Sequence, residues 1–247
     1  MPKTMVMVPT YNEKENIGSL LRDILQLDPS IGVVVVDDDS PDGTSQAVEA
    51  VRQTEPRVHL LTRKNKKGRG TAGIDGFLHA LDQGADLIVE MDSDYSHHPR
   101  HIPQLVDAMR DCDVAIGSRA VAGGGESGRG RIRQAITGFA GFFIRQVMGL
   151  DVKDCTSGFR CFKREVLQSI GLKHMVSQGP EIVEEVLYAC HLRGYRIKEI
   201  PIHFEDRVRG ESTKTFMQFA DTMLKIVQFR LTLKNRLRRL DWKSRAK

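Results

Sequence analysis

Long apolar runs are missing from this chain of 247 residues. No segment reaches the roughly 18 to 20 uninterrupted apolar residues that a helix needs to cross a bilayer. The first residues also lead directly into a strand-like segment, without the basic start and apolar stretch of a secretion signal. We therefore expect a protein of the cytoplasm rather than one that spans a membrane.

Cysteine is scarce, with four residues that lie far apart in the sequence. They form no C-x-x-C pair, which excludes the usual patterns of a zinc knuckle and of a dithiol redox site. We expect reduced thiols packed as small apolar side chains. Because 40% of the residues are hydrophobic, a chain of this length can bury one large core, and we predict one α/β domain.

Acidic residues are almost absent from the end of the chain. Residues 225–247 hold nine Lys or Arg and a single acid, Asp241, whereas the whole chain has a net charge of +5. The basic character therefore belongs to the C-terminal segment, and the remainder is net acidic. Such a segment suits an anionic membrane, a nucleic acid or simple solubility, and composition alone leaves all three open.

Short apolar runs alternate with helix-length amphipathic segments through the first half of the chain. The run of four valines at 33–36 is typical of a strand that is covered on both faces, as in a parallel sheet flanked by helices. The expected strands are 3–8, 33–36, 58–61, 86–91 and 113–116, and the expected helices are 13–27, 44–52, 71–81 and 102–110. The pattern predicts a doubly wound α/β fold.

The second half is less regular. Glycines at 123–130 predict a mobile loop that leads into a helix at about 132–148. Beyond it we expect a strand near 159–162, helices at 164–170 and 181–193, a strand at 196–204 and a last helix at about 216–240.

The last helix has apolar residues at helical spacing and is followed by the basic segment. The apolar positions are Phe216, Phe219, Ala220, Met223, Leu224, Val227 and Leu231. We predict that residues 215–247 form an amphipathic basic helix on a membrane surface, beside a domain formed by residues 1–214. A second contact is expected at Phe139, Phe142, Phe143 and Ile144; the alternative is that both segments pack on the core.

Polar and acidic residues follow three of the predicted strands. They are residues 9–13 (Pro-Thr-Tyr-Asn-Glu), 37–40 (Asp-Asp-Asp-Ser) and 92–98 (Asp-Ser-Asp-Tyr-Ser-His-His). The carboxyl ends of parallel strands form the edge at which open α/β sheets bind ligands. Several carboxylates at one edge repel each other unless a cation or a ligand rich in donors is present.

Asp92 and Asp94 form an Asp-x-Asp directly after a buried strand. Two such carboxylates can share one Mg²⁺ or Mn²⁺ and leave positions for phosphate oxygens. An isolated Asp-x-Asp is often only a cap or a turn, but its place beside a second acidic cluster favours the metal. Tyr11, Glu13 and Asp38 can pack against or hydrogen-bond a nucleoside, although Glu13 alone equally suits the first turn of a helix.

Residues 68–73, Gly-Arg-Gly-Thr-Ala-Gly, match the dinucleotide fingerprint G-x-G-x-x-G. That fingerprint places its first glycine at the turn that joins a strand to a helix, whereas residues 64–67 separate these glycines from the preceding strand. We therefore do not expect a nicotinamide or flavin site.

The motifs together point to one family. Besides the three strand ends, they comprise Gly117-Ser118-Arg119, residues 156–160 (Thr-Ser-Gly-Phe-Arg) and residues 206–212 (Asp-Arg-Val-Arg-Gly-Glu-Ser). This set resembles the polyprenol (dolichol) phosphate mannose synthases of glycosyltransferase family 2, over about residues 3–214. The resemblance implies a GT-A fold, a Rossmann-like, mostly parallel sheet flanked by helices.

The resemblance also implies roles for individual residues. The nucleotide-sugar would be bound by Pro9, Tyr11, Glu13, Val36, Asp38, Asp92, Ser93, Asp94, Arg207 and Lys214. The metal would be surrounded by Asp92, Asp94 and Ser96, and the acceptor phosphate by Arg119, Arg133 and Thr137. Catalysis would depend on Asp94, Arg119, Arg133 and Arg207.

Besides the helix near Glu185, where Val183 and Glu184 stand in place of the aromatic-Gln pair that the family often has, two positions depart from the family pattern. The family usually reads Gly-Leu-Gly where this chain has Gly68-Arg69-Gly70, and Glu-Ser-Lys where it has residues 211–214, Glu-Ser-Thr-Lys. The second change displaces the basic residue Lys214 by one position.

The implied reaction is a metal-dependent, inverting transfer of a sugar, with mannose from GDP-mannose expected, to a polyprenyl or dolichyl monophosphate. A phosphate monoester with a second pKa of about 6 can attack without a general base, and the metal and Arg207 would stabilise the leaving diphosphate. We expect peripheral association with the cytoplasmic face of a membrane and no nucleic acid; a need for membrane partner subunits stays open.

Two alternatives stay open. The first is a family 2 enzyme that uses a UDP-sugar or a different acceptor, either a saccharide or another lipid. The second is a non-catalytic protein that binds a membrane or a nucleic acid, against which the intact Asp-x-Asp argues.

Overall fold

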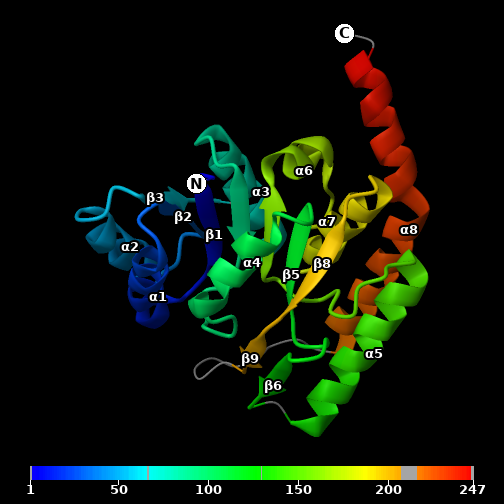
Figure 1. The fold of residues 1–247 in the computed structure, drawn as a ribbon, viewed down its shortest axis with the longest axis horizontal. Helices are drawn as coiled ribbons and strands as arrows, with labels where there is room; N and C mark the ends of the chain where they lie inside the picture. The colour runs from blue at the N-terminus through cyan, green and yellow to red at the C-terminus, as the bar shows by residue number, and fades with distance from the viewer. Residues whose placement is uncertain (1, 66, 129, 207–215, 246–247) are drawn as a thin grey trace.

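The computed structural model describes residues 2–65, 67–128, 130–206 and 216–245 (Figure 1). Its centre is a seven-stranded sheet of order β3-β2-β1-β4-β7-β5-β8, in which only β7 runs antiparallel to its neighbours β4 and β5. A second sheet consists of the parallel strands β6 and β9. The prediction of a mostly parallel sheet flanked by helices is confirmed.

The elements have the following bounds. The strands are β1 Thr4–Thr10, β2 Ile31–Asp37, β3 Val58–Thr62, β4 Leu87–Glu90, β5 Val114–Ser118, β6 Gly125–Ser127, β7 Arg160–Lys163, β8 Ile197–Pro201 and β9 His203–Glu205. The helices are α1 Lys14–Leu27, α2 Thr44–Arg52, α3 Arg69–Asp82, α4 Ile102–Ala108, α5 Arg131–Met148, α6 Arg164–Ser169, α7 Ile182–Leu192 and α8 Phe216–Arg245, with single 3₁₀ turns at Pro99–His101 and Leu172–His174.

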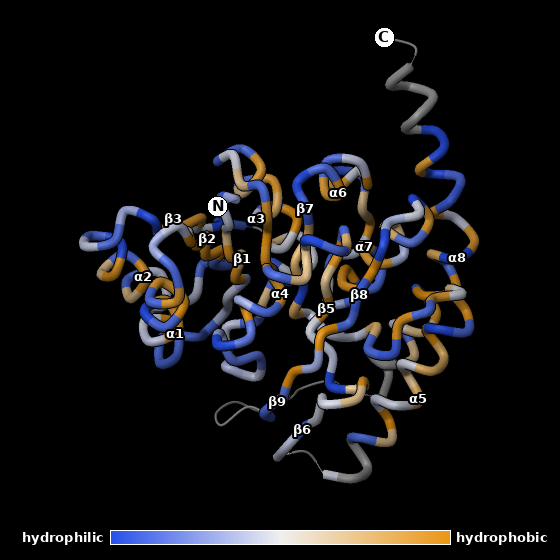
Figure 2. Tube along the Cα trace, viewed as in Figure 1, coloured by the Kyte–Doolittle hydropathy of each residue, from blue (hydrophilic) through white to orange (hydrophobic). Residues whose placement is uncertain are grey.

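Side chains of the central strands alternate between two apolar cores, one on each face of the sheet. Met5 and Met7 of β1 join the core that is covered by α3, α5, α6, α7 and α8. Val6 and Val8 join the core that is covered by α1, α2 and α4. Figure 2 shows apolar residues along these inner strands. Because both faces are covered, the strands read as continuous apolar runs.

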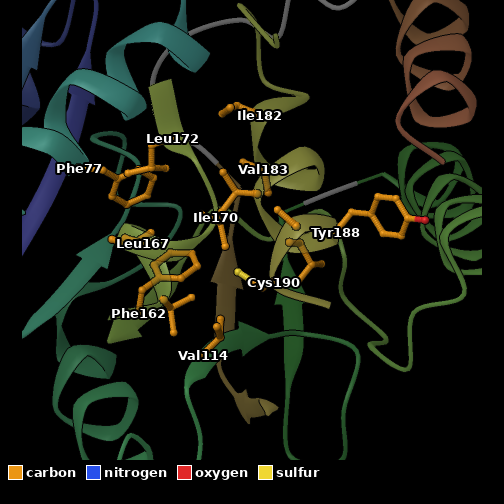
Figure 3. Close-up of a cluster of buried hydrophobic side chains, with 14 of the residues drawn as sticks. Phe77, Val114, Phe162, Leu167, Ile170, Leu172, Ile182, Val183, Tyr188 and Cys190 are labelled. Atoms are coloured by element: carbon orange, nitrogen blue, oxygen red, sulfur yellow. The ribbon is translucent and has the colours of Figure 1, made fainter. Parts of the chain in front are cut away.

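Aromatic packing joins α3 to the antiparallel strand. The rings of Phe77 and Phe162 lie edge to face with their centroids 5.5 Å apart (Figure 3).

All four cysteines are buried, as predicted, and burial raises the pKa of their thiols.

Two glycines of α3 permit close packing: Gly70, which belongs to the residues that mimic a dinucleotide fingerprint, and Gly76, which lies beyond them. A Cβ atom on Gly70 would lie 2.6 Å from the backbone oxygen of Ser177, and one on Gly76 would overlap Met7. The amide of Gly70 donates to the carbonyl of Gln178 at 2.9 Å. The start of α3 is therefore fixed against residues 177–179, and its middle against β1.

Two expectations for the second half were wrong. The glycine-rich stretch contains strand β6, which pairs with β9, so it is not simply a loop. The strand expected at 196–204 is divided: β8 pairs with β5 up to Pro201, and the chain then joins the second sheet. The buried Ile202 lies at the change, donating to the carbonyl of Ser118 and accepting from the amide of Gly125.

Helix α8 packs along α5 and α7, as Figure 1 shows at one side of the molecule. It buries Ile226, Phe229, Leu233 and Leu237, a stripe that the sequence analysis did not select. Leu224, Val227 and Leu231, which it did select, are exposed. Ile144, expected at a membrane, lies instead in the core at 1% exposure. Among the described residues, no helix combines the length and apolar character that crossing a membrane requires.

Candidate active site

The carboxyl ends of β1 and β2 bring two sequence-predicted segments side by side. The amide of Asn12 donates to the hydroxyl of Ser40 at 2.9 Å, and that of Glu13 to the hydroxyl of Thr44 at 2.9 Å. Pro9 and Val36 are buried at these strand ends, whereas the Tyr11 ring is 48% exposed. The predicted nucleotide-binding residues of the first two strands therefore share one edge of the sheet.

The three consecutive acids after β2 have different surroundings. Asp37 is fully buried and accepts from the amide of Ser40 at 3.1 Å and the hydroxyl of Ser45 at 2.6 Å, so it ties the loop together. Asp39 is exposed and has a positive φ of 54°. Asp37 also accepts from the hydroxyl of Thr10 at the end of β1, whereas Asp38 contacts the end of β3.

Asp38 forms an ion pair with Arg63, the residue that follows β3. The Arg63 Nε donates to Asp38 Oδ1 at 2.7 Å, and the amide of Gly68 donates to Oδ2 at 2.7 Å. Both side chains are buried. Arg63 also donates to Thr71 and Asp75 of α3. Asp38 therefore orders the segment that leads into α3.

A cavity of about 430 Å³ adjoins this ion pair. Thr71 and Asp75, which both contact Arg63, line it together with Lys67 and Gln178. The Lys67 ammonium lies 5.2 Å from the centroid of the Tyr11 ring. The cavity is thus bordered by Lys67, which lies near the Tyr11 ring, and by two residues that contact Arg63, the partner of Asp38.

The Asp-x-Asp loop turns sharply after β4. Ser93, Asp94 and Ser96 are buried, and the amide of Ser96 donates to Asp94 Oδ1 at 3.0 Å. Tyr95 has a positive φ of 61°, and its hydroxyl donates to Asp23 of α1 at 2.7 Å. Burial and this contact with Asp23 raise the pKa of Tyr95 to about 12. The loop is therefore held by a hydrogen bond within it, from Ser96 to Asp94, and by one to α1, from Tyr95.

Arg69, at the start of α3, contacts two acids of this edge. Its guanidinium donates to Asp92 Oδ1 at 2.9 Å and to Glu90 Oε1 at 3.1 Å. Burial opposes the charged form, but Asp92 and Glu90 outweigh it and raise the pKa of Arg69. Burial raises the pKa of Glu90, the last residue of β4. The side chain of Asp92 remains 32% exposed.

His97 connects the Asp-x-Asp loop to the strand end that carries Arg119. Its Nδ1 lies 3.8 Å from Asp92 Oδ2, and its ring packs 5.3 Å from those of Phe159 and Phe204. Burial lowers the pKa of His97. The Arg119 guanidinium lies 4.8 Å from the Phe204 ring. The two strand ends that carry Asp92 and Arg119 therefore converge on one aromatic side chain.

Arg119, predicted to meet the acceptor phosphate, is held by a buried acid. Its Nε lies 3.0 Å from Asp154 Oδ2, and its Nη2 donates to Thr156 at 2.9 Å. The amides of Lys153 and Asp154 donate to Glu199 of β8. The guanidinium is thus oriented by hydrogen bonds before any ligand binds.

The remaining predicted residues lie at or beyond the limits of the described structure. Arg207 and Lys214 lie outside the described residues, and of Arg133 only the backbone is described, in α5. Thr137 is half-buried in the second turn of that helix. Their predicted roles remain predictions.

Sequence reasoning missed Arg63 and Asp154. Arg63 follows β3 directly, so inspecting that strand end as the others were inspected would have found it. Asp154 lies two residues before the motif at 156–160, but nothing local identifies Arg119 as its partner. Arg69 was noted only as a departure from the family pattern.

The chemistry of the donor set suits a hard divalent cation. Asp92 and Asp94 offer carboxylate oxygens, the ligands that Mg²⁺ and Mn²⁺ prefer. Among the described residues, no group of three His, Cys, Asp or Glu is placed to hold a metal alone. The set therefore fits a metal whose other ligands come from a phosphate-bearing molecule.

The fold and the site define a glycosyltransferase of the GT-A type. The chain is similar in structure to glucosyl-3-phosphoglycerate synthase from Mycobacterium tuberculosis, solved with Mn²⁺, UDP and glucosyl-3-phosphoglycerate. The TM-score is 0.68 at 18% identity, over 95% of this chain and 80% of the other.

The chain belongs to glycosyl transferase family 2, whose model matches residues 5–171. It is 37% identical to the undecaprenyl-phosphate mannosyltransferase of Micrococcus luteus over 85% of this chain and 86% of that protein. It is 34% identical to the polyprenol monophosphomannose synthase of Mycolicibacterium smegmatis over 92% of this chain and 86% of that protein. The resemblance drawn from the motifs and the prediction of a glycosyltransferase are confirmed.

Proposed function

We propose that this enzyme transfers mannose from GDP-mannose to a polyprenyl monophosphate with a divalent metal. The observation that carries this proposal is that His97 of the Asp-x-Asp loop and Arg119 both contact Phe204, which brings the proposed metal-binding acids near the proposed phosphate-binding cation. The names of the two relatives, which are 37% and 34% identical to this chain, support the sugar and the lipid acceptor.

The donor side of the site consists of residues from β1, β2 and β4. Tyr11 offers an exposed ring to a nucleobase, while Glu13 and Asp38 lie at the same edge. Asp92 and Asp94 would hold Mg²⁺ or Mn²⁺, with Ser93 and Ser96 beside them. The metal would supply positive charge next to the leaving diphosphate. Arg207 and Lys214 are proposed to add to this charge.

The acceptor side needs to place a phosphate rather than activate it. A phosphate monoester is largely dianionic near neutral pH, because its second pKa is about 6, so it can attack the anomeric carbon without a general base. Arg119 is already oriented by Asp154 and Thr156, and a planar guanidinium can bind two phosphate oxygens at once. Attack opposite the leaving group inverts the anomeric centre. Arg133 and Thr137 are proposed as further phosphate contacts.

A lipid acceptor requires contact with a membrane, and two neighbouring helices offer apolar side chains. On α5, Ile136, Phe139 and Phe142 are at least half exposed, and on α8, Leu224 and Leu231 are about 70% exposed. The basic residues Lys234 and Arg238 are exposed further along α8. We propose that α5 and the segment 215–247 lie on the cytoplasmic face of an anionic membrane, where apolar burial and charge act together.

The proposal is tested by transfer of labelled sugar into lipid. Purified protein is incubated with Mg²⁺ or Mn²⁺, a short polyprenyl phosphate and a panel of labelled GDP- and UDP-sugars, in parallel with Asp94→Asn. Label from GDP-mannose in the lipid fraction, lost in the variant, is the expected result. Transfer from a UDP-sugar would show that the proposed donor is wrong. Absence of lipid labelling with every donor would show that the proposed acceptor is wrong.

A further inference from the structure

Arg69 lies between Asp92 of the proposed metal site and Glu90, the last residue of β4. Its guanidinium contacts Glu90, which is 2% exposed, and Asp92, whose side chain is 32% exposed. Both contacts are 2.9 to 3.2 Å long. A cation therefore lies in direct contact with one of the two carboxylates that would bind the metal.

The surroundings hold this guanidinium in place. A Cβ atom on Gly158 would lie 2.7 Å from Arg69 Nη2 and 3.5 Å from Asp92 Oδ2, so the absence of a side chain at Gly158 makes room for the pair. The backbone beside Arg69 is fixed as well, because the amide of Gly70 donates to Gln178 at 2.9 Å. The side chain is only 21% exposed.

The charge of Arg69 acts on the metal ion and on the diphosphate, the two molecules that the proposed site would bind. Like charges in a partly buried site repel and unlike charges attract, and solvent at a partly exposed site reduces both effects. A fixed cation next to Asp92 therefore opposes the entry of a second cation and favours the entry of an anion.

We propose that Arg69 is a positioning residue that fixes Asp92 and keeps the empty site close to neutral, which weakens binding of the metal alone and strengthens binding of the diphosphate alone. The inference rests on the proposed function in one respect, since it takes Asp92 as a metal ligand. It assigns a role to Arg69, the residue that stands where the family usually has the leucine of Gly-Leu-Gly.

The test uses the full chain with Arg69→Gln, which removes the charge and keeps a hydrogen-bond donor, and Arg69→Lys, which keeps the charge. Binding of Mn²⁺ alone is followed by the electron paramagnetic resonance signal of the free ion, and binding of GDP alone by calorimetry in a chelator. In Arg69→Gln we expect Mn²⁺ to bind about tenfold more tightly and GDP several-fold more weakly. Arg69→Lys should stay within about threefold of wild type for both.

The opposite changes in the affinities for Mn²⁺ and GDP distinguish this role from a merely structural one. Loss of local structure would weaken both Mn²⁺ and GDP, and that result, or unchanged affinities in Arg69→Gln, would overturn the inference. If Arg69→Gln does not fold, as judged by circular dichroism, Arg69→Leu, which removes the charge and places the family's usual residue at this position, replaces it and the same directions are expected.

Failure of the proposed function gives a different result. Wild-type protein that binds no Mn²⁺ even with saturating GDP would overturn the metal site and this inference together. Wild-type protein that binds Mn²⁺ with GDP but labels no lipid would overturn the acceptor alone, and the comparison of Arg69 variants would still decide this inference.

Discussion

The guanidinium of Arg236 on α8 donates to the fully buried carboxylate of Glu185 on α7 at 2.8 Å. Glu185 also accepts from the amides of Val176 and Ser177. The next residues along, 177–179, pack against Gly68 and Gly70 at the start of α3. The C-terminal helix is therefore part of the framework that supports the start of α3 and, with it, the candidate site.

Replacing Arg236 by Met should destabilise the protein by about 2 to 4 kcal/mol, because it leaves a buried carboxylate with only its backbone partners. The matched control is Arg238→Met, an exposed position on the same helix, which should change the free energy of unfolding by less than about 0.5 kcal/mol. Urea denaturation followed by circular dichroism measures both. Equal effects of the two substitutions would contradict a structural role for the pair.

Two glycines of α3 should respond in opposite ways to alanine. At Gly76 a Cβ atom would overlap Met7 and lie 3.0 Å from Val36, so Gly76→Ala should cost about 1 to 3 kcal/mol of stability. At Gly73 the nearest atom would be 3.8 Å away, and Gly73→Ala should be neutral or stabilise by up to about 1 kcal/mol through helix propensity. Thermal unfolding of the two variants decides this, and a stable Gly76→Ala would show that β1 can shift.

The exposed aromatic residues of α5 should contribute to membrane binding. Phe139→Ser/Phe142→Ser should reduce binding to vesicles of phosphatidylcholine and phosphatidylglycerol by about tenfold or more, because two large apolar side chains no longer leave water. Val176, 53% exposed on a different segment, provides the control Val176→Ser, which should bind normally. Flotation assays measure both, and unchanged binding of the double variant would exclude α5 as the contact.

The stability of the protein should decrease below the ordinary histidine pKa. His59 of β3 and His79 of α3 share a hydrogen bond of 3.1 Å, and burial lowers the pKa of both below 6.5. The unfolded chain therefore binds more protons as the pH falls through 6.5, and the free energy of unfolding decreases.

Denaturation midpoints at about pH 7.5 and about pH 5.5 test this expectation. His59→Gln/His79→Gln removes both titrations and should lose less stability between these pH values than the wild type. An equal loss in the variant would assign the pH dependence to other groups.

Much of the fold could be predicted from local pattern. Helix α2 has the predicted bounds, and the central strands differ from prediction by one to three residues at their ends. The apolar run at 33–36 was informative because both faces of β2 are covered. Strand β6 was missed because it has only three residues, begins with Gly125, and depends on pairing with the distant β9.

The site was predictable where function requires a residue type at a strand end. That rule located Asp38, Asp92 and Asp94. It could not show which cations hold these acids, because Arg69 pairs with Asp92 and Arg119 with Asp154 only after the chain has folded. The same limit applies to α8. Its buried stripe and its exposed stripe are both apolar in sequence, and only the folded structure shows which of them packs against α5 and α7.

The position of β7 has a consequence for the order in which the molecule is built during synthesis. This strand lies between β4 and β5, although the chain makes β5, β6 and α5 before it. A nascent chain that ends before Arg160 can assemble β3-β2-β1-β4. It still lacks β7, the strand that pairs β5 with that half of the sheet. Insertion of β7 is thus the step that unites the Asp92 and Arg119 sides, and its long-range pairing should set the pace of folding.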